Sequence, residues 1–375
     1  MRKRWLAACL CTVMLLSLAA CGPSSSKSSG PYAEMMEEEW EALWNEAQNQ
    51  TASFERIFAQ QAGDYVMTDR ERISSIDENF MEFLPKEYFS DVKSDQKGQI
   101  DKVEYDTYDY YLYQSQGTAE SQWEKETKTC YVYTPAGYSE SEKYNVYFLL
   151  HRKNYTESYW FISTVEDGED RELGQGDFVY LLDYAIANGL IEPAIFVACT
   201  AKIGEAGDEA PEHQMANFGY ELKNDLIPTI DAKYSTYASR EHRALGGASR
   251  GGLLVWGAMP VALSEVAYFA PICNGCVHTI YTNEQEAEAD RLCGIMNSPE
   301  NAQYDISYLF TFAGDCDTNK LRVYSTYDEV MRQMPDRLVW GENTYYGKPQ
   351  YGTHSNKYFY LAVYESMQLF FKNAE

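Results

Sequence analysis

The chain has 375 residues, of which 45% are apolar and 15% aromatic, enough for a large buried core in one large domain or two ordinary ones. This composition excludes a wholly disordered or fibrous protein. The formal net charge of −26 would repel the phosphate backbone of a nucleic acid over most of the surface. Nucleic acid is therefore not expected as a partner.

The first residues are typical of an export signal. Three basic residues at positions 2–4 precede an apolar run at 5–20, which is shorter than the roughly 20 residues of a comfortable membrane span. The run ends in small residues before Cys21 and so resembles the lipobox of bacterial lipoproteins. That resemblance implies a signal peptide at 1–20 and a lipid on the sulfur of Cys21. An uncleaved anchor or an ordinary secretory peptide is the alternative.

Residues 21–33 are rich in Ser and Gly and are predicted to form a flexible tether. We expect an exported lipoprotein of the bacterial cell envelope, with its main domain outside the cytoplasmic membrane and only the lipid in contact with that membrane. Residues 34–96 are predicted to be a helical and irregular N-terminal extension, because apolar residues recur at three- and four-residue steps up to about Gln61. Its helix is expected to pack on the main domain, and a partner-binding role is the alternative.

The main domain is predicted at residues 97–375, where apolar runs alternate with helical patterns. Strands are predicted at residues 131–134, 146–150, 195–199, 244–248, 266–270 and 308–313. Helices are predicted at residues 178–187, 218–233, 252–259, 322–334 and 357–371, the third ended by Pro260. The alternation predicts an α/β fold with a mainly parallel sheet and helices on both faces. Ligands of such a sheet lie at the carboxyl ends of its strands.

A GxSxG pattern centred on Ser249 follows the predicted strand at 244–248 and opens a helix. In this setting the flanking Gly247 and Gly251 permit a tight, strained turn that lifts a serine hydroxyl above the sheet. A glycine-rich crossover with a structural serine is the alternative. A serine needs a histidine base and an orienting carboxylate to become a nucleophile.

In such a sheet the expected order is Ser, then acid, then His. Three of the five histidines precede Ser249, and His278 follows it too closely, with only Glu265 as an acid between them. His354 remains, in a loop before the last helix. The acid should follow a strand between the two, where the strand at 308–313 runs into Asp315 and Asp317. Spacing alone does not choose between these two carboxylates, and one of them is expected to be an ordinary turn residue.

Six cysteines remain after the signal and Cys21 are set aside. Cys273 and Cys276 form a lone CxxC with His278 nearby, which lacks the second pair of a typical structural zinc site. Free, half-buried thiols are favoured over a local disulfide, and a disulfide over a metal site. No metal site or cofactor is predicted.

Several segments together resemble the esterase D-like α/β-hydrolases, and within them the feruloyl and acetylxylan esterases of carbohydrate esterase family one. They are YVYTPAGY at 131–138, KYNVYFLLH at 143–151, NFGYELKNDLIPTIDAKYSTY at 217–237, RALGGASRGG at 243–252, GDCD at 314–317 and GTH at 352–354. The resemblance implies Ser249 as nucleophile, His354 as general base and acid, and Asp317 as the orienting carboxylate, with Asp315 as second choice.

One turn departs from the family's pattern. Where the family has a glycine-bearing turn after a histidine, His151 is followed by Arg152, Lys153 and Asn154. An oxyanion hole needs two backbone N–H groups, and by position these are on Arg250 and Lys153. Loss of glycine removes access to positive φ angles, so the hole is expected to be altered. The bulky basic side chains are expected to narrow the acyl pocket or to contact a charged substrate.

The expected function is a surface-tethered serine esterase that removes feruloyl or acetyl groups from plant-wall polysaccharide through a Ser-His-Asp triad and an acyl-enzyme. Its partners would be an ester-bearing carbohydrate or a small acyl ester. One alternative is a catalytically degenerate member that binds glycan or a partner without turnover, suggested by the missing glycines after His151. The other is an esterase for a siderophore or another small acyl ester.

Overall fold

The computed structural model describes residues 41–52, 80–162, 173–174, 176–204, 211–279 and 281–372. The predicted signal peptide, Cys21 and the tether lie outside these residues, as do both ends of the predicted N-terminal helix. Within the described part of the chain, no helix combines the length and the apolar character needed to cross a membrane.

The centre of the molecule is an eight-stranded sheet in the order β1-β2-β4-β3-β5-β6-β7-β8. The pairs β1–β2 and β2–β4 are antiparallel, and all others are parallel. The strands are β1 (Gln99–Tyr108), β2 (Lys125–Thr134), β3 (Asn145–Leu150), β4 (Ala194–Cys199), β5 (Arg243–Ala248), β6 (Tyr268–Ile272), β7 (Tyr308–Phe312) and β8 (Thr344–Gly347). The predicted mainly parallel sheet is confirmed.

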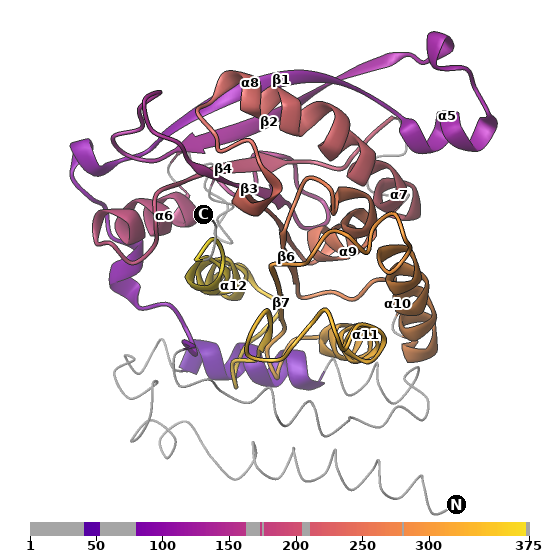
Figure 1. Ribbon diagram of the computed structural model, residues 1–375. Helices are drawn as coiled ribbons and strands as arrows, with labels where there is room; N and C mark the ends of the chain where they lie inside the picture. Colours follow the sequence, from indigo (N-terminus) through magenta and orange to yellow (C-terminus); the bar gives the residue numbers. More distant parts are fainter. Residues whose placement is uncertain are drawn as a thin grey trace, which may run out of the picture.

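Helices cover both faces of this sheet, as Figure 1 shows. One face packs against α6, α12 and the helix over residues 41–52, and the other against the remaining long helices. The helices are α5 (Tyr110–Gln116), α6 (Asp177–Ala187), α7 (Pro211–Glu221), α8 (Ile227–Lys233), α9 (Arg250–Ala262), α10 (Thr282–Met296), α11 (Lys320–Gln333) and α12 (Asn356–Leu369). A π-helical turn, η5 (Leu222–Leu226), joins α7 to α8.

The structure corrects the sequence predictions at a few places. The fifth predicted strand, at 266–270, is displaced by two residues and is β6 at Tyr268–Ile272. Helix α9 does not end before Pro260 but continues to Ala262 with the proline inside it. A proline lacks only its own N–H donor, and because this one lies in the last turn just two helical residues follow it. Strands β1 and β8 and helices α5 and α10 were not predicted.

The sheet brings the ends of four strands to one edge. Strands β3, β5, β6 and β7 are neighbours, run in the same direction and are buried along their lengths, except for Asn145 at the start of β3. The loops after them therefore meet at the carboxyl edge, where a parallel sheet places its ligands.

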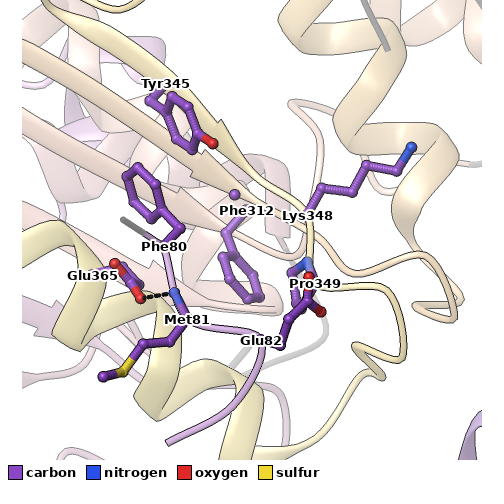
Figure 2. A pocket seen from close by; sticks show the side chains of 9 residues that line it. Phe80, Met81, Glu82, Phe312, Tyr345, Lys348, Pro349 and Glu365 are labelled. Atoms are coloured by element: carbon purple, nitrogen blue, oxygen red, sulfur yellow. Dashed lines mark hydrogen bonds between the residues drawn. The ribbon is translucent and has the colours of Figure 1, made fainter. Parts of the chain in front are cut away.

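The segment just before the main domain packs against the last two strands of the sheet, β7 and β8. The ring of Phe80 stacks on Tyr345 of β8 at 4.1 Å between ring centroids. The backbone N–H of Met81 donates to Glu365 of α12 at 2.7 Å. Figure 2 shows that these residues line a small pocket together with Phe312 of β7. This described part of the N-terminal extension is thus packed into the same body as the sheet.

Candidate active site

Ser249 occupies a strained turn between β5 and α9. Its backbone angles are φ 56° and ψ −112°, in a region that residues with a side chain rarely adopt. A Cβ atom on Gly251 would lie 2.5 Å from the Leu150 carbonyl oxygen, and one on Gly252 would lie 2.4 Å from that of Ile272. Only glycine lets the helix start so close to β3 and β6. This is the strand-turn-helix setting expected from the GxSxG pattern.

Asn274, in the loop after β6, holds the strained turn in place. Its side-chain N–H donates to the Ser249 carbonyl at 3.1 Å, and its side-chain oxygen accepts from the Gly275 N–H at 3.0 Å. The Ser249 N–H itself donates to the Ile272 carbonyl at 2.9 Å. Because Asn274 is buried, water does not compete for its hydrogen bonds, and they stabilise the backbone conformation of Ser249.

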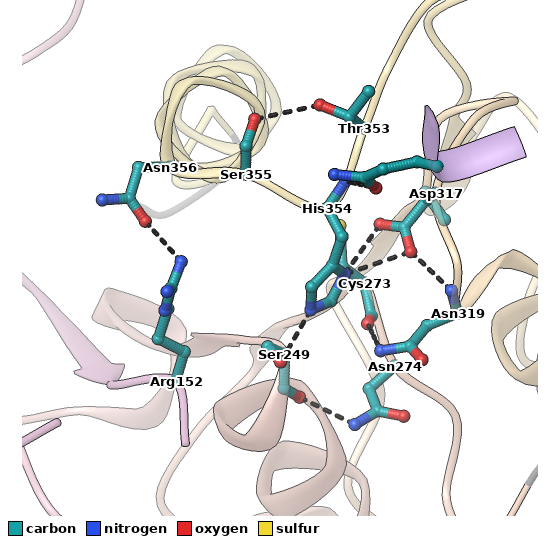
Figure 3. A network of polar contacts seen from close by, with 12 residues as sticks. Arg152, Ser249, Cys273, Asn274, Asp317, Asn319, Thr353, His354, Ser355 and Asn356 are labelled. Atoms are coloured by element: carbon teal, nitrogen blue, oxygen red, sulfur yellow. Dashed lines mark hydrogen bonds and ion pairs between the residues drawn. The ribbon is translucent and has the colours of Figure 1, made fainter. Parts of the chain in front are cut away.

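The structure brings Ser249, His354 and Asp317 together. His354 Nε2 lies 2.8 Å from the Ser249 hydroxyl, and Nδ1 lies 3.0 Å from Asp317 Oδ2 and 3.1 Å from Oδ1. Figure 3 shows the imidazole between the hydroxyl and the carboxylate. Asp317 is fully buried and also accepts from the Asn319 backbone N–H at 2.6 Å. A proton held on Nδ1 by the carboxylate leaves Nε2 as an acceptor facing the serine.

Asp315 is turned away from the histidine. Its carboxylate pairs with Lys348 at 3.2 Å, and its backbone carbonyl accepts from the ammonium group of Lys320 at 2.5 Å. Of the two carboxylates that spacing left open, Asp317 is therefore the one that contacts His354.

Cys273, Asp317 and His354 offer donor atoms that lie within 4.8 Å of one another, and zinc accepts all three kinds of donor. Burial raises the pKa of the Cys273 thiol well above its usual range, and the neighbouring Asp317 raises it further. The thiol is therefore held in its protonated form, while the other two groups bond to each other. Both ring nitrogens of His354 are thus engaged, one by Asp317 and the other by Ser249.

The six cysteines 130, 199, 273, 276, 293 and 316 are free thiols. The preference for free thiols over a CxxC disulfide is thus confirmed. All six are buried, rather than half-buried as predicted. Cys276 donates its S–H to the Gln285 carbonyl at 3.1 Å, which gives this thiol a structural partner.

The turn after β3 keeps a defined shape without glycine. His151 bonds the Arg152 carbonyl through Nδ1 at 2.7 Å and the Thr200 hydroxyl through Nε2 at 2.8 Å. The left-handed residue of the turn is Asn154, with φ 68°, and asparagine tolerates this region better than most residues. In a trans peptide the N–H points opposite to the C=O, so the fixed Arg152 carbonyl also fixes the direction of the Lys153 N–H.

The side chain of Arg152 is held by two residues beside the turn, Asn356 and Tyr155. It donates to Asn356 at 3.0 Å and to the Tyr155 hydroxyl at 3.2 Å, and its guanidinium lies 4.7 Å from the centre of the Tyr155 ring. Lys153 is exposed. The two basic residues of the turn therefore differ, since one is held by neighbours and the other reaches into solvent.

Four basic side chains follow the four strands that meet at this edge. They are Lys153 after β3, Arg250 after β5, His278 after β6 and Arg322 in the first turn of α11. Burial lowers the pKa of His278, and the positive charges of the other three lower it further. Burial also lowers the pKa of Arg322, and its buried Nε has no hydrogen-bond partner among the described residues. The edge is therefore locally positive in a strongly acidic protein.

Sequence reasoning did not identify the residues that support this arrangement. Asn274 and Asn319 are single polar residues in loops, and no spacing rule marks them. Asn319 donates its side-chain N–H to the Cys273 carbonyl at 3.2 Å. This bond joins the loop after β7, which carries Asp317, to the loop after β6, whose Asn274 holds the backbone of Ser249.

A family model described as "Putative esterase" matches residues 120–368. Two relatives resemble shorter stretches. An endo-1,4-beta-xylanase Y from Acetivibrio thermocellus is 36% identical over 156 residues, 39% of this chain and 13% of its own length. An endo-1,4-beta-xylanase/feruloyl esterase from Xylanibacter ruminicola is 31% identical over 144 residues, 35% of this chain and 18% of its own length. The matches thus span less than a fifth of either relative.

Solved structures resemble more of the chain. A mutant feruloyl esterase module from Clostridium thermocellum, complexed with sinapinate, is 25% identical with a TM-score of 0.59, and the match covers 78% of this chain and 94% of that one. A ferulic acid esterase from Anaeromyces mucronatus, in complex with ferulic acid, is 16% identical with a TM-score of 0.54, covering 78% and 98%. The second likeness concerns the fold alone. The predicted α/β-hydrolase fold is confirmed.

Proposed function

Because the chain belongs to the putative esterase family, we propose that it is a serine esterase that hydrolyses carboxylic esters through an acyl-enzyme. The observation that carries this proposal is the 2.8 Å bond between His354 Nε2 and the Ser249 hydroxyl, with a buried Asp317 on the other ring nitrogen. A serine in this environment can lose its proton to the imidazole as it attacks a carbonyl.

The proposed reaction has two halves. Ser249 attacks the ester carbonyl while His354 takes its proton, and the backbone N–H groups of Arg250 and Lys153 stabilise the oxyanion. His354 then protonates the departing alcohol, which leaves the acyl group on the serine. Water attacks the acyl-enzyme with the same base, and the acid and the free serine are released. Asp317 keeps the imidazole in the right tautomer throughout.

The proposed substrates are feruloyl or acetyl groups on plant-wall polysaccharide. The two xylanase relatives, one of them also a feruloyl esterase, and the sinapinate complex of the structural neighbour support a link to xylan and to phenolic acyl groups. A panel of methyl ferulate, acetylated xylan and short aryl esters, compared by kcat/KM, would separate these substrates.

The basic groups at the carboxyl edge favour a substrate that carries a negative charge close to the ester. Arg322 supports this idea most directly, because its half-buried guanidinium group carries one of the positive charges that act on His278 at this edge. A carboxylate on either the acyl group or the alcohol would be a suitable ligand.

A covalent fluorophosphonate probe tests whether the hydroxyl is activated. We expect labelling at Ser249 and hydrolysis of 4-nitrophenyl acetate by the full chain. Both should be lost in Ser249→Ala with an unchanged thermal unfolding curve. A folded chain that takes up no probe would instead fit a glycan- or partner-binding protein without turnover.

We also propose that the protein is a lipoprotein of the bacterial envelope, tethered through Cys21. The lipobox-like end of the apolar run supports this proposal. In a bacterial host the wild-type chain should sediment with membranes, and Cys21→Ala should not carry lipid. Equal amounts of both chains in the soluble fraction would contradict the anchor.

A further inference from the structure

The helix over residues 41–52 packs against the loop that carries the catalytic histidine. Leu43 and Ala47, on one side of this helix, are buried in the main core. The ring of Trp44 meets the edge of Tyr351 at 6.0 Å between centroids. Figure 1 shows this indigo helix against the yellow end of the chain, more than 250 residues later in the sequence. A segment of the N-terminal extension is therefore part of the wall behind His354.

Polar bonds from the same helix reach the histidine loop itself. The backbone N–H of His354 donates to Gln50 Oε1 at 2.7 Å. The Thr353 hydroxyl donates to Glu46 Oε1 at 2.5 Å, and Lys357 pairs with Glu46 Oε2 at 3.2 Å. Thr353 is fully buried, so its bond does not compete with water. The chain on both sides of His354 is thus held by two side chains of one helix.

We propose that Gln50 is a positioning residue, which holds the backbone of His354 so that its imidazole reaches Ser249 and Asp317 together. His354 lies in a loop, where no ladder of backbone bonds fixes its position. Its two ring contacts, at 2.8 and 3.0 Å, leave little room for displacement. A misplacement of about 1 Å at a reacting group costs roughly a hundredfold in rate. The Gln50 bond acts at the backbone N–H of the histidine itself.

This role is additional to the part that the family shares. The family match begins at residue 120, whereas the described part of the helix covers residues 41–52. The inference rests on the proposed function for its catalytic consequence, but the geometry it concerns exists whether or not the chain turns over an ester.

The test compares Gln50→Ala and Gln50→Glu with Asn45→Ala, an amide on the exposed side of the same helix. Gln50→Ala removes the acceptor, and we expect kcat for 4-nitrophenyl acetate to fall about tenfold with little change in KM. Gln50→Glu keeps an acceptor and should restore most of kcat. Asn45→Ala should behave as wild type. Thermal unfolding of each variant shows whether the fold is kept.

Gln50→Glu also provides a signature that a purely structural role would not produce. The new carboxylate would stabilise the protonated imidazole, so the acid limb of the kcat/KM profile should move to higher pH. The groups that already face the imidazole are Asp317, the Cys273 thiol and the Ser249 hydroxyl, and Glu46 and Lys357 pair beside the loop. None of them changes in this variant, so the shift would report the new charge.

An NMR titration of the histidine ring protons separates this inference from the esterase itself. His354→Gln identifies the signal, and we expect its midpoint to rise in Gln50→Glu and to stay in place in Asn45→Ala. If the wild-type chain showed neither hydrolysis nor probe labelling, the proposed esterase function would be rejected. A raised midpoint for His354 in Gln50→Glu would still support the positioning role. An unshifted midpoint in Gln50→Glu, or wild-type kcat in Gln50→Ala, would overturn the inference.

Discussion

His354 contacts Asp317 through Nδ1 at 3.0 Å, and this single bond determines which ring nitrogen faces Ser249. A carboxylate accepts but does not donate, so Nδ1 must carry the proton and Nε2 must present its lone pair to the hydroxyl. Asp317 is itself fixed by the Asn319 backbone N–H at 2.6 Å. The carboxylate therefore acts on the serine indirectly, through the tautomer of the histidine.

Asp317→Asn is expected to lower kcat by roughly 10³- to 10⁴-fold, because an amide can donate to Nδ1 and favour the wrong tautomer. Asp315→Asn is the matched control, since its carboxylate pairs with Lys348 and does not contact the histidine. It should keep kcat within a few-fold of wild type. Rates with 4-nitrophenyl acetate measure both. Comparable losses in the two variants would refute the assignment of Asp317.

Gly251→Ala is expected to destabilise the fold by about 2 kcal/mol or more and to reduce activity. Its Cβ would lie 2.5 Å from the Leu150 carbonyl oxygen and 3.0 Å from that of His151. The clash would push α9 away from β3 and so separate the two proposed oxyanion donors. Urea unfolding and kcat measure these effects.

Gly294→Ala provides the control for this substitution. Gly294 lies in α10, and apart from its chain neighbours and the nearby backbone of its own helix no described atom lies within 4 Å of the position that an alanine methyl group would occupy there. Alanine at this position should stabilise the fold by up to about 1 kcal/mol, because it favours the helix. If Gly251→Ala were as harmless as Gly294→Ala, the close approach of α9 to β3 would be wrong.

Most of the parallel sheet could be predicted because its strands are uniformly apolar. Strand β1 was missed because it is half-solvated, with Val103, Tyr105 and Thr107 buried and the acidic Glu104 and Asp106 between them. Helix α10 was missed because its buried face is narrow and includes the polar Gln285. In both elements the apolar face is small, so the pattern stands out less than the uniformly apolar runs of the other strands.

The candidate site could be predicted only in part, from the GxSxG motif and from the order of the residues along the chain. Ser249 lies in a GxSxG pattern, and His354 is the histidine that remains when order is considered. Asp315 and Asp317 could not be separated by spacing, since both follow β7 in one turn. Lys348, 33 residues after Asp315, pairs with it on one side of the turn. Such distant partners decide which carboxylate turns inward, and no local pattern contains them.

Asp183→Asn is expected to improve stability relative to wild type as pH rises. Burial raises the pKa of Asp183 above its ordinary value of 3.8, although Gly98, Tyr133 and Lys97 oppose the shift. Above that ordinary value the unfolded chain has lost the proton that the folded chain still holds, so stability falls with pH until the folded group also ionises. Asparagine does not titrate.

The amide oxygen introduced by Asp183→Asn can still accept the bonds that the carboxylate accepts from the Tyr133 hydroxyl at 2.7 Å and the Gly98 N–H at 2.8 Å. The difference in free energy of unfolding between variant and wild type should therefore move in the variant's favour from about pH 4 upward, until the folded carboxyl group has also ionised. Urea unfolding at several pH values measures it. A difference that is constant with pH would contradict the raised pKa.

Arg322→Gln is expected to lower kcat/KM about tenfold for anionic esters and to change it little for neutral ones. The reason is the loss of a charge-assisted hydrogen bond, worth about 1.5–3 kcal/mol.

Two pairs of substrates measure this effect. One pair places the charge on the acyl group and compares the 4-nitrophenyl half-ester of glutaric acid with 4-nitrophenyl butanoate. The other places it on the alcohol, 3-acetoxybenzoate against its methyl ester. Any effect of Arg322 on Asp317 is the same for both members of a pair, so it cancels in the ratio of their kcat/KM values. Arg332→Gln is the matched control, because this exposed arginine of the same helix pairs with Glu329. A wild-type preference for the neutral member of both pairs would show that the positive edge does not select the substrate.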